Sequence, residues 1–189
     1  MVRYIYRSME MSDNNIMAQL KKGKTRALAV LVEKYKKQAY FMALGMVGNS
    51  DDAYDISQEA FLRVYNSART FDETRSFFPW FYAIIANLCR NVLKKRQIDA
   101  ARTVDMADVE FLLVDRSDPE SGLVEKEEKE CLLKAMKKLD FSDREIINLN
   151  HFRMMSYDEI AQVLGIPKGT VMSRLYYARK KLAKLMEEV

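Results

Sequence analysis

The chain has 189 residues, a mass of 22.1 kDa and a formal net charge of +4. With 49% hydrophobic and 31% charged residues it can bury the cores of one or two small domains, which excludes a mostly disordered chain. One histidine, two cysteines and six glycines argue against a His-based metal site or triad, a disulfide framework and a glycine-rich nucleotide loop.

Helical periodicity in the first half of the chain predicts four helices, over residues 12–22, 25–47, 50–69 and 79–97. Ser12 is a candidate N-cap for the first helix, and Gly48 ends the second. The third helix has Leu62 and Tyr65 among the residues of its apolar side. Pro79 suits the first turn of the fourth helix.

Residues 100–123 lack a sustained period and contain Pro119. Residues 100–130 carry 10 Asp and Glu against 4 Lys and Arg, whereas the flanking parts of the chain have an excess of positive charge. We therefore expect an all-α protein with a helical domain over residues 12–99, an acidic linker over 100–123 and a second helical domain over 124–189.

The second half of the chain predicts about four more helices. Ser142 and Ser156 are each followed three residues later by glutamate, at Glu145 and Glu159, and this spacing is typical of a capping box. The last helix is expected to begin at Pro167 and to run almost to the end of the chain.

Residues 156–179, SYDEIAQVLGIPKGTVMSRLYYAR, have the spacing of a helix-turn-helix, with Gly165 at the turn. The non-core positions of its second helix are candidate DNA contacts, namely Lys168, Thr170, Met172, Ser173, Arg174, Tyr177 and Arg179. Arg174 suits a guanine edge, and Lys168 suits a phosphate near the helix start. The alternative is a plain pair of antiparallel helices with a solvated basic face.

A second group of polar residues lies in DDAYDISQEAFLRVY, where Asp55, Gln58 and Glu59 share one helix face beside Leu62. An acidic and amide surface next to apolar side chains suits docking onto a basic protein surface. The alternative is an ordinary solvated helix face.

Aromatic residues cluster over 71–82 and are followed by polar and basic side chains at Asn87, Arg90, Asn91, Lys94, Lys95 and Arg96. Rings that stack on unpaired bases, beside cations that follow phosphates, are typical of single-stranded DNA binding. We expect Trp80, Phe81 and Ile84 to lie in the core, and Phe71 to be the exposed ring.

Taken together, DDAYDISQEAFLRVY and SYDEIAQVLGIPKGTVMSRLYYARKKL resemble the bacterial RNA polymerase sigma factors of the extracytoplasmic-function (ECF) type. Residues 31–96 resemble sigma region 2 and residues 132–185 resemble region 4, so the resemblance covers almost the whole chain in the family's order. The chain departs from the family pattern at Phe141-Ser142, which replaces the usual proline-containing entry to the helix-turn-helix.

The resemblance implies a promoter-specificity subunit without catalysis or cofactor of its own. Asp55, Gln58, Glu59 and Leu62 would contact the clamp of the largest polymerase subunit, and region 4 would contact the flap of the second-largest subunit. The loop and helix over 71–96 would open the −10 element and capture a flipped base, and residues 168–179 would read the −35 element. The acidic linker would thread toward the active-site channel.

The implied partners are core RNA polymerase, promoter DNA and an anti-sigma factor. No apolar run long enough to span a bilayer and no signal peptide occur, so we expect a cytoplasmic protein without direct membrane insertion. One competing hypothesis is a stand-alone helix-turn-helix regulator with an N-terminal dimerisation domain. An enzyme is the other, and it lacks a candidate nucleophile with a base, a metal cluster or a phosphate loop.

Overall fold

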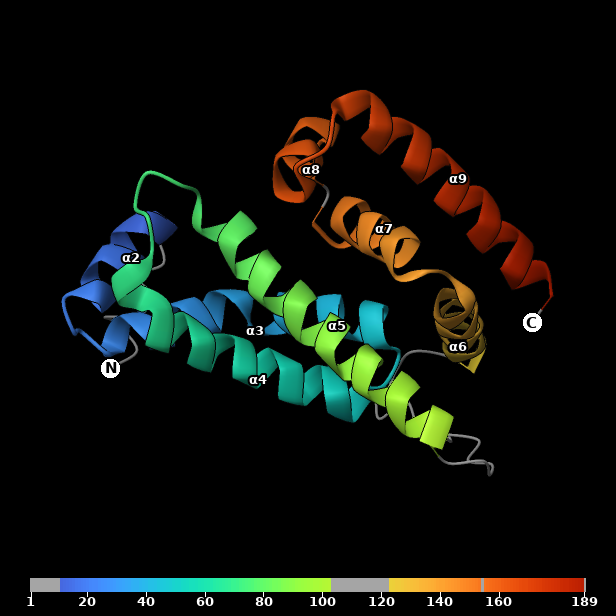
Figure 1. Cartoon of the computed structure of the whole chain (residues 1–189), viewed down its shortest axis with the longest axis horizontal. Coiled ribbons are helices and arrows are strands. Elements are labelled where there is room, and N and C mark those ends of the chain that lie inside the picture. The colour runs from blue at the N-terminus through green and yellow to red at the C-terminus, as the bar shows by residue number, and fades with distance from the viewer. Residues whose placement is uncertain (1–10, 103–122, 154, 189) are drawn as a thin grey trace.

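The computed structural model describes residues 11–102, 123–153 and 155–188, and within these ranges it contains helices and no strand. The elements are α2 (Asp13–Lys21), α3 (Arg26–Val47), α4 (Ser50–Ser67), the 3-10 turn η1 (Ala68–Thr70), α5 (Phe77–Arg102), α6 (Leu123–Lys138), α7 (Phe141–Arg153), α8 (Tyr157–Leu164) and α9 (Lys168–Glu187). The expected all-α fold of two small helical domains is confirmed (Figure 1). Most of the expected acidic linker, residues 103–122, lies outside the described residues.

Three helix ends in the first domain have clear caps. The Ser12 hydroxyl accepts the Asn15 amide hydrogen and caps α2. Asn49 caps α4, because its Oδ1 accepts the Asp52 amide hydrogen at 2.9 Å. Gly48 has φ of +66° and ends α3 in a left-handed conformation.

The core of this domain is built around aromatic rings from α3, α4 and α5. Phe77 and Phe81 stack with ring centroids 5.4 Å apart, and Tyr35 packs against both rings. Phe81 is fully buried, as expected, while Trp80 and Ile84 are only half-buried at the edge of this core. These rings hold α5 in a fixed orientation on α3 and α4.

In the second domain, the predicted capping box at Ser156 is confirmed, with the Ser156 hydroxyl and the Glu159 carboxylate each bonded to the other residue's backbone. Gly165, at φ of +65°, forms the turn to α9, and Ile160 of α8 packs in the same core as Val171 of α9. The geometry is that of a helix-turn-helix.

The second predicted capping box, at Ser142, is wrong. The Asp140 carbonyl accepts the amide hydrogens of Asp143 and Arg144, so α7 begins at Phe141 and Ser142 lies inside its first turn. The Glu145 side chain therefore does not cap this helix, and Glu145 is buried, at 6% exposed.

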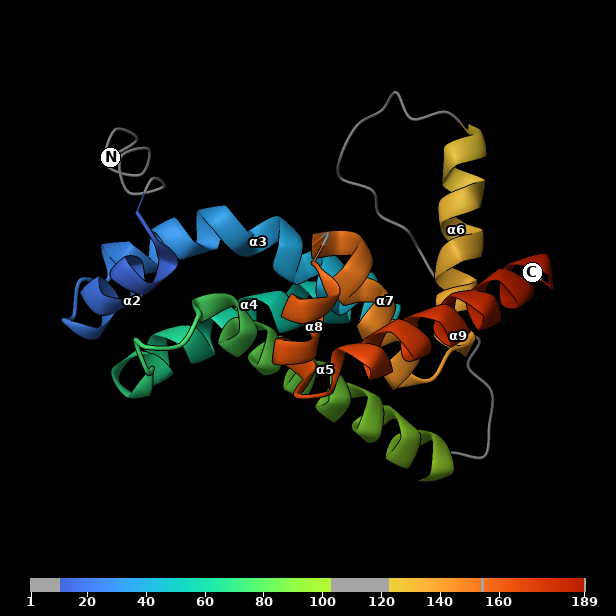
Figure 2. The same cartoon turned by 90° about the horizontal axis from the view of Figure 1, so that it is seen from above.

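The two domains pack against each other. α7 lies along the C-terminal part of α3, α8 lies over α5, and α6 meets the end of α3, as the two perpendicular views show (Figures 1 and 2). This arrangement brings the helix-turn-helix next to the helix that carries the basic residues over 87–96. In the described ranges, no helix is both long and apolar enough to cross a membrane.

Candidate protein and nucleic-acid interfaces

The outer face of α4 carries the residues expected to dock onto a protein. Asp55 and Gln58 are exposed, and the Leu62 side chain is 56% exposed. Glu59 is half-exposed, and its Oε1 lies 3.0 Å from Nε of Arg63, one helical turn further on. The four predicted residues are thus brought together on one accessible strip of a single helix.

Leu62 and Tyr65 were expected on the apolar side of α4, but both are exposed. The helix turns a narrower stripe toward the core, formed by Ala53, Ile56, Ser57, Ala60, Phe61 and Val64. Tyr54, which sequence reasoning missed, is 58% exposed and lies beside Asp55, and Tyr65 is 46% exposed. Exposed rings spaced along a polar face are typical of a protein interface.

The expectation that Phe71 is an exposed ring is wrong. Phe71 is 3% exposed, and its ring centroid lies 4.9 Å from that of Trp80 and 6.3 Å from that of Phe77. The ring follows the 3-10 turn η1 and points into the core. Removing its apolar surface from water stabilises the fold. Phe71 therefore anchors the start of the loop in the core and does not offer a surface for stacking.

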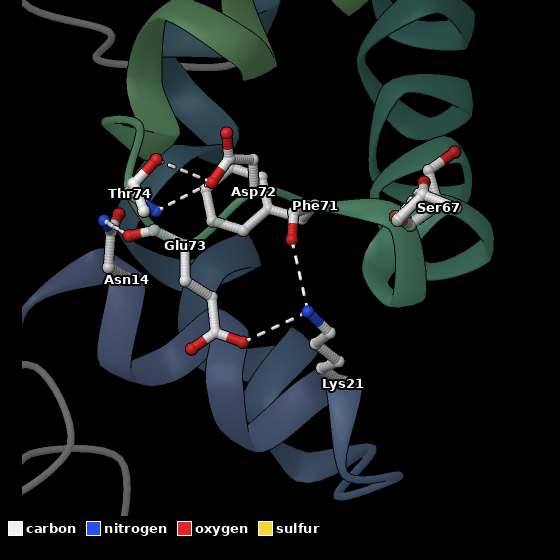
Figure 3. A network of polar contacts seen from close by, with 8 residues as sticks. Asn14, Lys21, Ser67, Phe71, Asp72, Glu73 and Thr74 are labelled. Atoms are coloured by element: carbon white, nitrogen blue, oxygen red, sulfur yellow. Dashed lines mark hydrogen bonds and ion pairs between the residues drawn. The ribbon is translucent and has the colours of Figure 1, made fainter.

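The rest of this loop, residues 72–76, is exposed and held in one shape (Figure 3). Asp72 Oδ1 accepts hydrogen bonds from the Thr74 amide at 3.0 Å and from the Thr74 hydroxyl at 2.7 Å. These hydrogen bonds lower the pKa of the Asp72 carboxyl, because they stabilise its charged form.

α5 carries an exposed polar strip that begins at Asn87, ten residues after the start of the helix at Phe77. The expected DNA contacts Asn87, Arg90, Asn91, Lys94 and Lys95 are all exposed on this helix. Together they form a polar and basic track, as the spacing predicts.

Arg96 does not point freely from this track. Its Nη2 pairs with the Asp52 carboxylate and its Nη1 donates to the Val47 carbonyl at 3.2 Å. Its guanidinium therefore links α5 to the end of α3 and to the start of α4. Arg96 thus has a structural role within the domain, beside any contact with DNA.

The recognition helix α9 turns Val171, Leu175 and Ala178 into the core. On the opposite side, Met172 is 51% exposed and Tyr177 is 63% exposed, as expected. Tyr176, which the sequence reasoning missed, is also 63% exposed. Its spacing of four residues from Met172 is the signal that would have found it.

Several polar groups on α9 already have partners within the chain. Lys168 Nζ lies 2.7 Å from the Asp158 carboxylate. Arg179 donates to Asn150 Oδ1 at 2.5 Å. Ser173 donates its hydroxyl to the carbonyl of half-buried Thr170 at 3.1 Å. The first two contacts are exposed, so they cost little to exchange for phosphate contacts.

Residues of α5, α7 and α9 come together at the interface between the domains. Arg90 Nη2 of α5 lies 2.7 Å from Oε1 of Glu145 of α7, and the Arg90 guanidinium lies 4.8 Å from the centroid of the Phe141 ring. Burial raises the pKa of the Glu145 carboxyl, and the charge of Arg90 opposes that rise. Half-buried Arg174 of α9 donates to the Ser142 carbonyl at 3.4 Å. Arg90, Arg174 and Glu145 line one small cavity of about 180 Å³.

A close backbone approach lets α7 dock on α3. A side chain added at Gly45 would overlap the Asn148 side chain, and Arg144 donates to the Met46 carbonyl. Among the described residues, the Asn148 amide and the Arg144 Nε are buried without a hydrogen-bond partner. Such unpaired groups favour separation of the domains, because water would satisfy them.

No group of three or more His, Cys, Asp or Glu side chains converges as a metal site in the part of the chain that the structure describes. Cys89 is fully buried, and burial raises the pKa of its thiol to about 12.

Comparison with known proteins matches both domains to one family. Residues 31–98 match Sigma-70 region 2, and residues 129–182 match Sigma-70 region 4. The ECF RNA polymerase sigma factor SigW of Bacillus subtilis (strain 168) is 33% identical over 187 residues, which cover 96% of this chain and 100% of SigW. The ECF RNA polymerase sigma-E factor of Escherichia coli (strain K12) is 28% identical over 181 residues, which cover 93% of this chain and 94% of that protein.

Solved structures show the same fold. CnrH, in complex with the cytosolic domain of CnrY, superposes with a TM-score of 0.67 at 25% identity, over 94% of this chain and 99% of CnrH. The sigma factor RpoE of Bartonella quintana superposes with a TM-score of 0.64 at 20% identity, over 82% of this chain and 94% of that one. Because region 2 and region 4 occur in order and the likeness to SigW spans both chains, this protein belongs to the ECF RNA polymerase sigma factors.

Proposed function

We propose that this chain joins core RNA polymerase, brings it to promoters with suitable −35 and −10 elements, and assists the melting of the DNA. The observation that carries this proposal is the presence, in one chain, of a region 2 domain with an exposed docking face and a region 4 helix-turn-helix. The proposed domain bounds are 12–99 and 124–189, joined by an acidic linker over 100–123.

The exposed strip of α4 is proposed to bind the clamp of the largest polymerase subunit, and region 4 to bind the flap of the second-largest. Asp55, Gln58, Glu59 and Leu62 supply charge, amide and apolar contacts on consecutive turns. Exposed Tyr54 lies beside Asp55 at the start of the same strip. A complementary partner surface is basic with an apolar patch, since mutual charge complementarity steers docking.

The −10 element is proposed to meet α5 and the loop before it. Asn87, Arg90, Asn91, Lys94 and Lys95 follow one side of the helix and suit the backbone and base edges of a displaced strand. Since the Phe71 ring is buried, the loop offers backbone groups and polar side chains to an unpaired base.

The −35 element is proposed to lie along α9, with Arg174 at a base edge and Lys168 at a phosphate. Met172, Ser173 and Tyr177 add apolar and polar contacts from the exposed side of the same helix. Neither domain needs to bind DNA tightly alone, because attachment of both to polymerase raises their effective concentration at the promoter.

The chain is proposed to carry out no catalysis, since the chemistry of transcription belongs to its polymerase partner, and to act in the cytoplasm where that polymerase works. An anti-sigma factor is a proposed further partner. The likeness to CnrH, solved in complex with the cytosolic domain of CnrY, supports this.

Run-off transcription with purified core polymerase tests the proposal. Core with the chain should give a promoter-dependent transcript that core alone does not. An active core that gives no such transcript would contradict it. A tight, sequence-specific shift of duplex DNA by the free chain would favour the stand-alone regulator instead.

A further inference from the structure

The shape of the loop over residues 71–76 is set before any DNA arrives. Its residues other than Phe71 are exposed and irregular, and such loops usually lose backbone entropy when they adopt one shape for a ligand. In the proposed function this loop meets the bases of the opened −10 element. Whatever holds its shape therefore affects how well it discriminates between bases.

The Asn14 side chain, in the first turn of α2, holds two backbone carbonyls of this loop, and Figure 3 shows the one that belongs to Glu73. Its Nδ2 donates to the Glu73 carbonyl at 2.9 Å and to the Arg75 carbonyl at 2.9 Å. A carboxamide has two N–H donors, and both are used here on alternate residues of the loop. A single side chain thus braces the tip of the loop from a helix about sixty residues earlier in the chain.

Lys21 holds the beginning of the loop from the same side of α2. Its Nζ lies 3.2 Å from Oε1 of Glu73 and 3.4 Å from the Phe71 carbonyl oxygen. Seven residues separate Lys21 from Asn14, which is close to two helical turns, so both side chains face the loop. The loop is therefore bound at its start and at its tip by one helix.

α2 is itself a fixed support. Ile16, Met17 and Leu20 on its other side are 1%, 0% and 4% exposed, within the core of the domain. The Asp13 carboxylate also pairs with Lys34 of α3 at 2.5 Å. Because the match to region 2 begins at residue 31, α2 lies outside the residues that the family match covers.

We propose that α2 is part of the apparatus that reads the −10 element, with Asn14 as a positioning residue. Asn14 holds the Glu73 and Arg75 carbonyls so that the loop presents one shape to an unpaired base. This inference rests on the proposed function, since it takes the loop to be a reader of the −10 element.

The test uses holoenzyme reconstituted with the wild-type chain, with Asn14→Ala and with Asn15→Ala. Asn15 is the matched control, because it is the adjacent asparagine of α2, is exposed and has no side-chain hydrogen bond to the described loop residues. Transcription is measured from promoters with single substitutions through the −10 element and, separately, through the −35 element.

Asn14→Ala should reduce the ratio of transcription between the best and the substituted −10 elements by about fivefold, since it removes two hydrogen bonds that fix the loop. Discrimination at −35 should not change, and Asn15→Ala should match the wild type throughout. An unchanged −10 ratio would overturn the proposal. A loss of equal size at both elements would also overturn it, because that indicates a general defect in folding or polymerase binding.

Two additions keep the test decisive. Lys21→Gln should give the same selective loss at −10, and it replaces Asn14→Ala if that variant does not fold. Hydrogen exchange of the free chain should be faster in residues 72–76 of Asn14→Ala, and unchanged exchange there would overturn the bracing role. If the wild-type holoenzyme shows no −10 discrimination, the proposed function fails, while the exchange measurement still decides what Asn14 does.

Discussion

Glu145 of α7 and Arg90 of α5 form an ion pair across the two domains, with Oε1 and Nη2 2.7 Å apart. A carboxylate of the proposed −35 domain thus holds a cation of the proposed −10 track. The Arg90 guanidinium also lies over the Phe141 ring, so its charge is turned away from solvent on two sides. Docking of the domains therefore occupies part of the Arg90 guanidinium, although 47% of the side chain stays exposed.

A methyl group at position 45 would press on the contact between α3 and α7. Gly45 lies within α3, and a Cβ there would overlap the buried Asn148 side chain. Gly45→Ala should separate the domains, and it should not harm α3, because alanine favours a helix over glycine by roughly 0.5–1 kcal/mol. Small-angle scattering of the free chain should show a larger radius of gyration than that of the wild type.

A second substitution provides the control. Among the described residues, the Asn148 amide has no hydrogen-bond partner, so Asn148→Ala removes the obstacle without removing a described hydrogen bond. The double variant Gly45→Ala with Asn148→Ala should return to the wild-type radius. If Gly45→Ala scatters like the wild type, docking through this contact is not how the domains meet in solution.

Arg174 is proposed to read a base at −35. Arg174→Ala should weaken recognition of the preferred −35 element by about 1–3 kcal/mol and leave binding to substituted elements almost unchanged. Holoenzyme affinities for a set of −35 variants measure this. An equal loss on every sequence would show that Arg174 contacts only phosphate.

Glu59 is proposed to contact polymerase from the exposed strip of α4. Glu59→Lys should abolish binding to core polymerase yet leave the fold intact, since charge changes on a helix surface rarely unfold a domain. Glu33→Lys makes the same charge change at an exposed position of α3 and should bind as the wild type does. The measurements are binding of each variant to core RNA polymerase and its thermal unfolding by circular dichroism. Undiminished binding by Glu59→Lys would reject the assignment.

Phe71 is a core residue of the first domain rather than a stacking ring. Phe71→Ala should lower the free energy of unfolding by about 3–5 kcal/mol, because it leaves a cavity beside Trp80 and Phe77. Denaturant unfolding of the free chain measures this. A Phe71→Ala chain with wild-type stability and a selective loss of −10 binding would restore the stacking role.

Local signals in the sequence predicted the elements whose cause is local. The Ser156 capping box and the left-handed turn at Gly165 depend on neighbours within a few residues, and both occur where expected. The helical spacing of Val171 and Leu175 likewise placed the recognition helix.

Features that depend on distant parts of the chain could not be predicted from local sequence. Glu145 has the spacing of a capping residue, yet its partner Arg90 is 55 residues away. Phe71 lies in a loop that sequence alone suggests is exposed, but Trp80 and Phe77 cover it. The brace from Asn14 to the loop over 71–76 has no local sequence signature at all.

Selection of binding sites from randomised promoter DNA, with reconstituted holoenzyme, tests most directly whether one chain reads two promoter elements. The account predicts enrichment of two sequence blocks, one at −35 and one at −10, with Arg174→Ala relaxing only the first and Asn14→Ala only the second. A single palindromic block, or the same enrichment by the free chain without polymerase, would contradict it.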